Sequence, residues 1–269
     1  MMCRLLKVSR SGFYAWQKRT PSTRVQQRQL VAQALTLNFE KFKKRYGAIR
    51  LTKELNETGV PCSLNHIAKL MKEKQLRARN GKGFRYGPRT EAMTNVADNL
   101  LERDFSAPAP NLKWVSDITY IKVGQVWLYL AVVMDLYSRK VIGWALDEHM
   151  REELIIEAFN MAVSLREVQP KAIIHSDRGV QYRANKYQQL LLDNQIQCSM
   201  SRKGNCWDNA AMESFFGRFK VELIYAEKYR TVSEAKTSIF EYIELFYNRV
   251  RRHSAIGYMS PNDFEAKPN

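Results

Sequence analysis

Apolar side chains recur at helical spacing in the first third of the chain. The recurrence covers residues 24–42, 49–55 and 64–75, and Ser63 stands where a serine hydroxyl can cap the last of these helices. Lysines lie on the other faces of the segment 64–75. The pattern predicts a small all-α region of helix-turn-helix type whose basic last helix can enter a DNA major groove. An ordinary three-helix bundle with solvated lysines has the same pattern.

The pattern changes at Lys113, after which β-branched and aromatic residues dominate short runs. Gly124-Gln125 separates the first two runs and indicates a hairpin. We expect strands at 114–123, 127–136 and 141–146, a helix at 152–165, a buried strand at 172–175, a helix at 185–194, a short strand at 196–200, a polar loop at 201–206 and two long helices at 208–225 and 233–248. Three antiparallel strands followed by alternating helices and strands predict an α/β layer fold.

These elements divide the chain into three parts. Residues 1–80 form the basic helical region, and residues 111–269 form the globular α/β part with its C-terminal helices. Between them, residues 81–110 are rich in glycine, proline and basic residues and show no periodicity. Such a segment is typical of a linker, and it can also follow a phosphate backbone.

Positive charge is concentrated near the N-terminus. The chain has 43 Lys and Arg against 27 Asp and Glu, a formal net charge of +16. Residues 1–105 hold 22 of the basic and 8 of the acidic side chains, and residues 106–269 hold 21 and 19. This excess favours a polyanionic partner, nucleic acid or an anionic membrane surface. We expect the first part to hold DNA electrostatically, although a ribosomal-type or merely soluble basic domain has similar charge.

Cysteine and histidine usage excludes several classes of protein. The four cysteines and four histidines are scattered, without the close pairs of a structural zinc site. Free thiols in a chain of this size fit a reducing cytoplasm better than a disulfide framework. No signal peptide is apparent, and the longest apolar run, 126–134, is less than half the length that crosses a bilayer. We expect a cytoplasmic protein with no membrane partner.

Three acidic residues lie at positions where a carboxylate could bind a metal ion. Asp117 lies inside the first predicted strand, where a charge is costly unless it is paired or metal-bound. Asp177 follows the buried strand, at an edge where an open sheet presents ligands. Glu213 lies off the apolar side of its helix. A helix-capping acid and a solvated helix acid are the alternative interpretations of the last two.

The chemistry of phosphodiester cleavage explains why three acids would converge. In-line displacement requires stabilisation of the attacking and the leaving oxygen, and a pair of Mg²⁺ ions provides it. Mg²⁺ prefers hard carboxylate ligands. Asp117, Asp177 and Glu213 are therefore the predicted catalytic and metal-binding residues.

Basic and amide side chains near these acids are candidate DNA contacts. Lys220 lies two turns beyond Glu213 on the same stripe of the helix and can reach a phosphate. Arg202 and Lys203 belong to the polar loop, which is either a DNA-contacting flap or simply solvated. Asn209 either orients Glu213 or caps its helix. The other candidates are Arg50, Lys69 and Lys72 in the helical region and Arg251 at the basic end of the last helix, where a cation contacts phosphate or offsets the helix dipole.

Two further polar residues are given structural roles. Asp135 could be a fourth ligand, but Arg139 nearby offers it a salt bridge. His175 precedes Asp177 by two residues and lies on the same face of an extended strand, where it could tune the site. A packed or hydrogen-bonded histidine is the commoner outcome at such a position.

The spacing of the acids combines with several motifs. There are 59 residues between Asp117 and Asp177 and 35 between Asp177 and Glu213. The motifs are Trp114-Val115-Ser116-Asp117-Ile118-Thr119-Tyr120, Met134-Asp135-Leu136-Tyr137-Ser138-Arg139, His175-Ser176-Asp177-Arg178-Gly179, Gly204-Asn205-Cys206-Trp207-Asp208-Asn209-Ala210, Glu213-Ser214-Phe215-Phe216 and Tyr247-Asn248-Arg249 with His253-Ser254. From about residue 5 almost to the C-terminus, the chain resembles the second-frame transposase of insertion sequences of the IS-three family, which has the DDE core of retroviral integrases.

The resemblance implies a fold, an activity and partners. It implies a ribonuclease-H-like core, with a mixed sheet flanked by helices, and two Mg²⁺ or Mn²⁺ ions. The activity would be DNA 3′-end cleavage and strand transfer, in which a 3′-OH attacks directly. The partners would be double-stranded DNA, further copies of the chain, and an upstream-frame product as fusion or partner, at the bacterial nucleoid. A non-catalytic DNA-binding relic or self-repressor, and a nuclease that only hydrolyses, are the alternatives.

Overall fold

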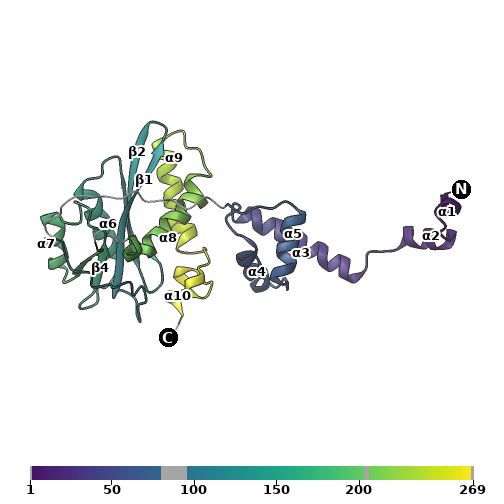
Figure 1. The fold of residues 1–269 in the computed structure, drawn as a ribbon, viewed down its shortest axis with the longest axis horizontal. Coiled ribbons are helices and arrows are strands. Elements are labelled where there is room, and N and C mark those ends of the chain that lie inside the picture. The colour runs from purple at the N-terminus through teal and green to yellow at the C-terminus, as the bar shows by residue number, and fades with distance from the viewer. Residues whose placement is uncertain (1, 80–95, 203–205, 268–269) are drawn as a thin grey trace. The chain divides into compact units, whose positions relative to one another are not determined.

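The computed structural model describes residues 2–79, 96–202 and 206–267, which fall into two compact units, Met1–Arg79 and Asn80–Asn269. The first unit is helical, and the second combines one sheet with helices (Figure 1). Among the described residues, no helix is both long and apolar enough to cross a membrane.

The first unit contains helices α1 (Met2–Leu5), α2 (Arg10–Lys18), α3 (Thr23–Lys41), α4 (Ala48–Glu57) and α5 (Leu64–Glu73). The last three match the helices predicted from apolar periodicity to within about two residues at each end. Their buried side chains are Val31, Leu35, Phe39, Leu51, Leu55, Ile67, Leu70 and Met71.

The predicted cap of α5 is confirmed. The Oγ atom of Ser63 accepts a hydrogen bond from the backbone N–H of His66 at 3.3 Å. By contrast, α2 buries none of its side chains, and its ring residues Phe13, Tyr14 and Trp16 are exposed. Apolar burial therefore comes from α3, α4 and α5.

One five-stranded sheet, in the order β3-β2-β1-β4-β5, forms the centre of the second unit. The strands are β1 (Lys113–Val123), β2 (Val126–Asp135), β3 (Val141–Asp147), β4 (Ile173–Ser176) and β5 (Gln197–Met200). β2 is antiparallel to both its neighbours, whereas β4 is parallel to β1 and to β5. The predicted hairpin and the mixed sheet are confirmed. Gly124 makes the hairpin turn with a φ of 59°, a conformation that glycine adopts without strain.

Helices cover both faces of this sheet (Figure 1). Successive side chains of a strand point to opposite faces, so β1 contributes Trp114 to the core under α6 and α7 and Val115 to the core under α8 and α9. The helices of this unit are α6 (Glu152–Leu165), α7 (Asn185–Asp193), α8 (Ala210–Phe219), α9 (Val232–Phe240) and α10 (Pro261–Ala266).

The two long C-terminal helices are less regular than predicted. A 3₁₀ turn, η1 (Cys206–Asn209), precedes α8. Two π-helical segments, η2 (Lys220–Ile224) and η3 (Glu241–Tyr247), continue α8 and α9. A π turn holds more residues than an α turn, so the side chains that follow it no longer keep the α-helical stripe. Because η2 begins at Lys220, this change in spacing affects the residues after Lys220 and not its predicted alignment with Glu213.

The expected linker 81–110 has two different halves. Residues 81–95 lie outside the described residues. Residues 96–110 pack on the sheet unit, where Leu101 is 1% exposed and Phe105 is half-buried in the core under α8. Apolar side chains therefore anchor this half, which does not act as a linker.

Gly143 of β3 lies against α6 where a side chain has no room. A Cβ atom there would lie 2.1 Å from the carbonyl oxygen of Ala158 and 2.9 Å from the Cβ of Ala162. We expect Gly143→Ala to lower the melting temperature by roughly 2 to 12 °C, because overpacking costs about 1–3 kcal/mol and each kcal/mol is worth about 2–4 °C in a domain of this size. Thermal melts followed by circular dichroism would measure the shift.

Gly217→Ala is the matched control. A Cβ at Gly217 would meet nothing within 4 Å, and alanine favours a helix more than glycine does. Its melting temperature should stay the same or rise. Similar losses in both variants would contradict the close approach of β3 and α6.

Candidate active site

Asp117 lies in the middle of β1 on the face that α8 covers. Alternation along the strand puts it on the same side as Val115 and Ile121, which belong to the core shared with α8. The residue is only 8% exposed. Its Oδ1 atom accepts a hydrogen bond from the backbone N–H of Ile118 at 2.8 Å. A carboxylate is therefore held within the sheet beside α8.

The register of two parallel strands brings Asp177 next to Asp117. The pairs between β1 and β4 have a constant offset of 60 positions, and the last of them is Val115 with His175. Asp117 and Asp177 have the same offset, two residues further on, and neighbouring strands lie about 4.8 Å apart. The backbone N–H of Gly179 donates to Oδ1 of Asp177 at 2.8 Å and so fixes the turn after β4.

Tyr182 lies close to both aspartates. It is buried, and its hydroxyl lies 3.0 Å from the Oγ atom of Ser116. Burial raises the pKa of Tyr182 well above its usual value, and the nearby charges of Asp117 and Asp177 raise it further. The two carboxylates therefore share one electrostatic environment. Sequence reasoning missed Tyr182, since nothing in its local pattern distinguishes it from a core tyrosine.

Glu213 lies in the first turn of α8. This helix packs on the sheet through Met212, Phe215, Phe216 and Phe219, which are the apolar positions expected from the sequence. Glu213 is half-buried, and burial raises the pKa of its carboxyl group. Its helix thus covers the face of the sheet on which Asp117 lies.

The three acids do not form a closed cluster. Within the parts of the chain that the structure describes, no group of three or more His, Cys, Asp or Glu side chains is close enough to hold a metal ion. The structure brings Asp117 and Asp177 together and places Glu213 on the helix above them. The donors themselves, three carboxylates from separate elements, are of the type that Mg²⁺ and Mn²⁺ prefer.

Lys220 lies between the sheet and the end of α8. It is 4% exposed, and its Nζ atom is 4.7 Å from the centroid of the Tyr120 ring. Burial lowers the pKa of Lys220, and the charge of Asp117 partly opposes that effect. Lys220 therefore places a positive charge near Asp117. Its side chain is buried, whereas the sequence pattern predicted a lysine on the exposed face of the helix.

These groups lie along an open edge of β1. Pairing with β4 ends at Val115, while β1 continues to Val123 beside β2. Among the described residues, no strand covers the other side of this continuation. β1 thus has an edge without a strand partner next to Tyr120, whose side chain is exposed, while Asp117 and Lys220 are buried beside it.

The buried carboxylate of Asp208, just before α8, binds residues from two other segments, 99–103 and the loop at Arg202. Asp208 is 0% exposed, and its Oδ1 accepts hydrogen bonds from Arg103 and Arg202, both at 3.0 Å. Its Oδ2 accepts from Asn99 at 2.9 Å and from the backbone N–H of Arg202 at 2.9 Å. These bonds, above all those from the Arg202 side chain, hold the pKa of Asp208 below its usual range. The network fixes the start of the helix that carries Glu213.

Asp208 was part of a quoted motif but received no role from the sequence. An aspartate directly before a helix is typical of a residue that caps the helix N-terminus, and this pattern does not predict a buried carboxylate that binds two arginines. The partners Asn99 and Arg103 are more than 100 positions away, so the network could not be inferred from local pattern.

The structural role predicted for His175 is confirmed. Its Nδ1 and Nε2 atoms lie 2.8 and 3.1 Å from the hydroxyls of Ser199 and Ser201, and burial lowers the pKa of His175 to about 4. The imidazole is therefore neutral at neutral pH and packed against β5.

Asp135 is also structural, but not through the expected salt bridge. It is fully buried and accepts hydrogen bonds from the backbone N–H groups of Asn111 and Tyr137 at 2.8 and 2.9 Å. The guanidinium of Arg139 instead donates to the carbonyl of Phe105 at 3.0 Å.

The predicted DNA contacts differ in accessibility. Lys69 and Lys72 are exposed on α5, and Arg50 of α4 lies over the Tyr46 ring at 5.7 Å. The side chain of Arg202 is 55% exposed although it binds the buried carboxylate before α8. Lys203 lies outside the described residues.

Asn209 and Arg251 do not have the surroundings that were expected. Asn209 precedes α8, but its side chain makes no capping bond, and its buried Oδ1 has no hydrogen-bond partner among the described residues. Arg251 is 3% exposed and binds Glu222 through two hydrogen bonds of 2.9 and 2.7 Å. The predicted phosphate contact of Arg251 is wrong, because a buried carboxylate already occupies its guanidinium.

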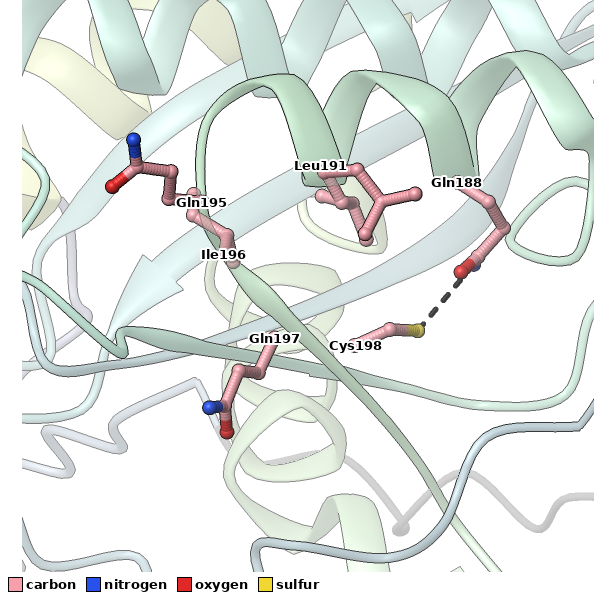
Figure 2. Close-up of a pocket in the computed structure, with 7 residues that line it drawn as sticks. Gln188, Leu191, Gln195, Ile196, Gln197 and Cys198 are labelled. Carbon is pink, nitrogen blue, oxygen red and sulfur yellow. Dashed lines mark hydrogen bonds between the residues drawn. The ribbon is translucent and has the colours of Figure 1, made fainter.

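A shallow pocket of about 280 Å³ lies away from the acids, between α7 and β5 (Figure 2). β4 separates β5 from β1 in the sheet. The Nε2 atom of Gln188 donates to the Sγ of Cys198 across it at 3.4 Å. The lining residues are Gln188, Leu191, Leu192, Gln195, Ile196, Gln197 and Cys198, none of which is charged. The pocket does not suit a phosphodiester.

Family models match both units. Two integrase core domain models match residues 107–206 and 194–261, and an HTH-like domain model matches residues 26–83. The helical unit therefore corresponds to the HTH-like domain and the sheet unit to the integrase core.

Curated relatives match nearly the whole chain. The transposase InsF for insertion sequence IS3A of Escherichia coli strain K12 is 44% identical over 268 residues, which cover 99% of this chain and 93% of the relative. The insertion element IS600 uncharacterized 31 kDa protein of Shigella sonnei is 41% identical over 268 residues, with 99% and 98% covered.

A solved assembly shares the fold. The cryo-electron microscopy structure of the simian T-cell lymphotropic virus intasome in complex with PP2A regulatory subunit B56 gamma matches with a TM-score of 0.51 and 15% identity, over 81% of this chain and 71% of the matched chain. With the five-stranded mixed sheet and its flanking helices, this match shows that the second unit has the ribonuclease-H-like fold of integrase cores.

Proposed function

We propose that this chain, which belongs to the IS3 family of insertion-sequence transposases, cleaves DNA 3′ ends and transfers the strands with divalent metal ions held by Asp117, Asp177 and Glu213. The observation that supports the proposal is the parallel pairing of β1 with β4, which ends at Val115 and His175, so that Asp117 and Asp177 each lie two residues beyond the last pair. Glu213 stands on the helix that covers the same face. Asp117 in β1, Asp177 after β4 and Glu213 in α8 are thus the three carboxylates that would hold the ions.

Mg²⁺ or Mn²⁺ is the cofactor that this donor set suits. A pair of such ions, when bound, would stabilise the attacking and leaving oxygens of the phosphodiester. Asp117 and Asp177 would supply the adjacent ligands, and Glu213 would complete the set by a change in its side-chain position. The half-buried position of Glu213 raises its pKa, so bound cations would also favour its ionised form.

The protein's own residues would position the DNA. Lys220, beside Asp117, supplies a positive charge near the reacting phosphate. Lys69 and Lys72 on α5, with Arg50 on α4, would bind DNA through the helical unit, whose segment of the chain carries most of the positive charge. Arg202 lies on the catalytic side, at the start of the loop before α8.

We expect the substrate to be double-stranded DNA formed by the element's terminal repeats and a target. Further copies of the chain would assemble on that DNA, since two ends must be joined. An upstream-frame product, as fusion or partner, would supply additional DNA binding. The reaction would take place in the bacterial cytoplasm, at the nucleoid.

Strand joining by the wild type and by Glu213→Gln tests the function. Oligonucleotide duplexes that carry the terminal repeats of the encoding element are incubated with the full chain and Mg²⁺, and products are separated by size. Joined strands are expected from the wild type, and none with a chelator or with Glu213→Gln, which keeps the side chain's size but loses its charge. DNA binding by the variant should be unchanged.

Three other results would point elsewhere. Equal joining by Glu213→Gln would remove this residue from the site. Nicked strands without joined products would indicate a hydrolytic nuclease. DNA binding without cleavage in the wild type would support a non-catalytic relic or self-repressor.

A further inference from the structure

Two aromatic rings stand exposed on the hairpin of β1 and β2. Tyr120 and Trp127 are each 45% exposed, and their ring centroids are 5.5 Å apart in an edge-on arrangement. The strand register sets Lys122 opposite Trp127 and Tyr129 opposite Tyr120, so these side chains share one face of the hairpin. Adjacent exposed rings of this size indicate a binding surface.

Lysines accompany both rings. The Nζ atom of Lys122 is 5.7 Å from the centroid of Trp127, and that of Lys220 is 4.7 Å from the centroid of Tyr120. Such cation–π contacts orient the rings and place positive charge beside them. Asp117 is the only acidic residue in the segment 113–129. Tyr120, Lys122, Trp127 and Lys220 are called the aromatic platform below.

The aromatic platform lies close to Asp117 along β1. Tyr120 follows Asp117 by three residues on an extended strand, a distance of about 10 Å. Lys220 lies close to Asp117 and over Tyr120. A DNA strand advances about 3.4 Å per nucleotide. The odd spacing turns the Tyr120 side chain to the opposite face of β1 from Asp117, so a strand whose phosphate lies at Asp117 reaches the platform, about three nucleotides away, across the edge of β1 that β4 leaves unpaired.

We propose that the aromatic platform stacks on unpaired nucleobases of the DNA strand, about three nucleotides from the reacting phosphate. The proposal rests on the proposed function, which places that phosphate at Asp117. Aromatic side chains bind bases of any sequence by stacking, and neighbouring lysines hold the phosphates between them. The platform would hold the unpaired bases of a frayed DNA end while the sugar-phosphate backbone of that strand lies at Asp117.

The charge of the surface favours DNA over a second copy of the chain. Lysine is depleted in the buried centres of protein–protein interfaces. Here Lys122 and Lys220 lie directly against the rings. A polyanion with flat bases matches both features of the platform, whereas an apolar protein surface matches only the rings.

Binding of two short strands tests the proposal. The full chain, without metal, is titrated with a ten-nucleotide oligothymidine and with an abasic strand of the same length and charge. We expect the wild type to bind oligothymidine about tenfold more tightly, because stacking contributes only when bases are present. Trp127→Ala should lose most of this preference, and Trp127→Phe, which keeps a ring, should retain it.

Leu192→Ala is the control for loss of an exposed apolar side chain. Leu192 is 68% exposed on α7, where it lines the pocket between α7 and β5, and its removal should leave the preference unchanged. Thermal melts check that every variant is folded.

An unchanged preference in Trp127→Ala would overturn the proposal, as would a wild type that binds both strands equally. A change in oligomeric mass by light scattering, with the preference intact, would also overturn it and assign the platform to contacts between copies. Since binding is measured without metal, failure of strand joining would not affect this readout. The two proposals can therefore fail separately.

Discussion

Asp117→Asn is expected to reduce strand joining at least about 1000-fold while the protein stays folded. Metal ions stabilise transition-state charge by several kcal/mol, and each 1.4 kcal/mol corresponds to a factor of ten. Asparagine has the size of aspartate but lacks the charge that holds a cation in the sheet. Gel separation of joined products at equal protein concentration would measure the loss.

Metal-induced stabilisation gives a second readout for the same variant. A cation that binds only the folded state raises the free energy of unfolding, and hence the melting temperature, with the logarithm of its concentration once that exceeds the Kd. The wild type should be stabilised by Mn²⁺, and Asp117→Asn should respond much less. Joining within tenfold of the wild type, or an equal response to Mn²⁺, would contradict the assignment of Asp117 as a ligand.

Glu222→Ala is expected to cause the largest loss of stability. Glu222 and Arg251 form an ion pair whose side chains are 2% and 4% exposed, and Tyr242 donates a further hydrogen bond to Glu222 at 3.0 Å. Removing one partner leaves the other charge buried without compensation, at a cost of about 3–5 kcal/mol. The melting temperature should fall by roughly 6 to 20 °C in calorimetry, at about 2–4 °C per kcal/mol.

An exposed ion pair provides the control. Lys186 and Glu153 lie 3.9 Å apart with side chains 62% and 54% exposed, so Glu153→Ala should change stability very little. The double replacement of Glu222 and Arg251 by methionine should recover part of the loss, because it removes both buried charges. Equal effects of Glu222→Ala and Glu153→Ala would show that burial does not decide the strength of these pairs.

Regular elements could be predicted wherever a local pattern is strong. The helices α3, α4 and α5 and the hairpin of β1 and β2 follow from periodicity and from a glycine at the turn. Segment 96–110 shows no helical or strand periodicity, so its local pattern predicts a linker. The burial of Leu101 depends on a core built by strands and helices elsewhere in the chain.

Side-chain directions beyond the regular elements could not be predicted. The helical pattern places Lys220 on the stripe of Glu213, but the contact of its Nζ atom with the Tyr120 ring depends on how the helix packs beside β1. Arg251 was assigned to a surface because it lies in a basic run, but its partner Glu222 is 29 positions away. Charge composition shows how many cations a segment has, and only packing shows which of them are buried.

The sequence by itself determined the order of the elements and the family and gave three candidate acids, since periodicity, motifs and spacing are properties of the chain alone. Only the tertiary structure decided that Asp117 and Asp177 each lie two residues beyond the last pair of β1 and β4, that Lys220 lies near Asp117 and that Asp208 anchors the start of α8. Each of these facts depends on contacts between residues distant in the chain. Such contacts arise from the packing of helices on both faces of the sheet and from the pairing of its strands.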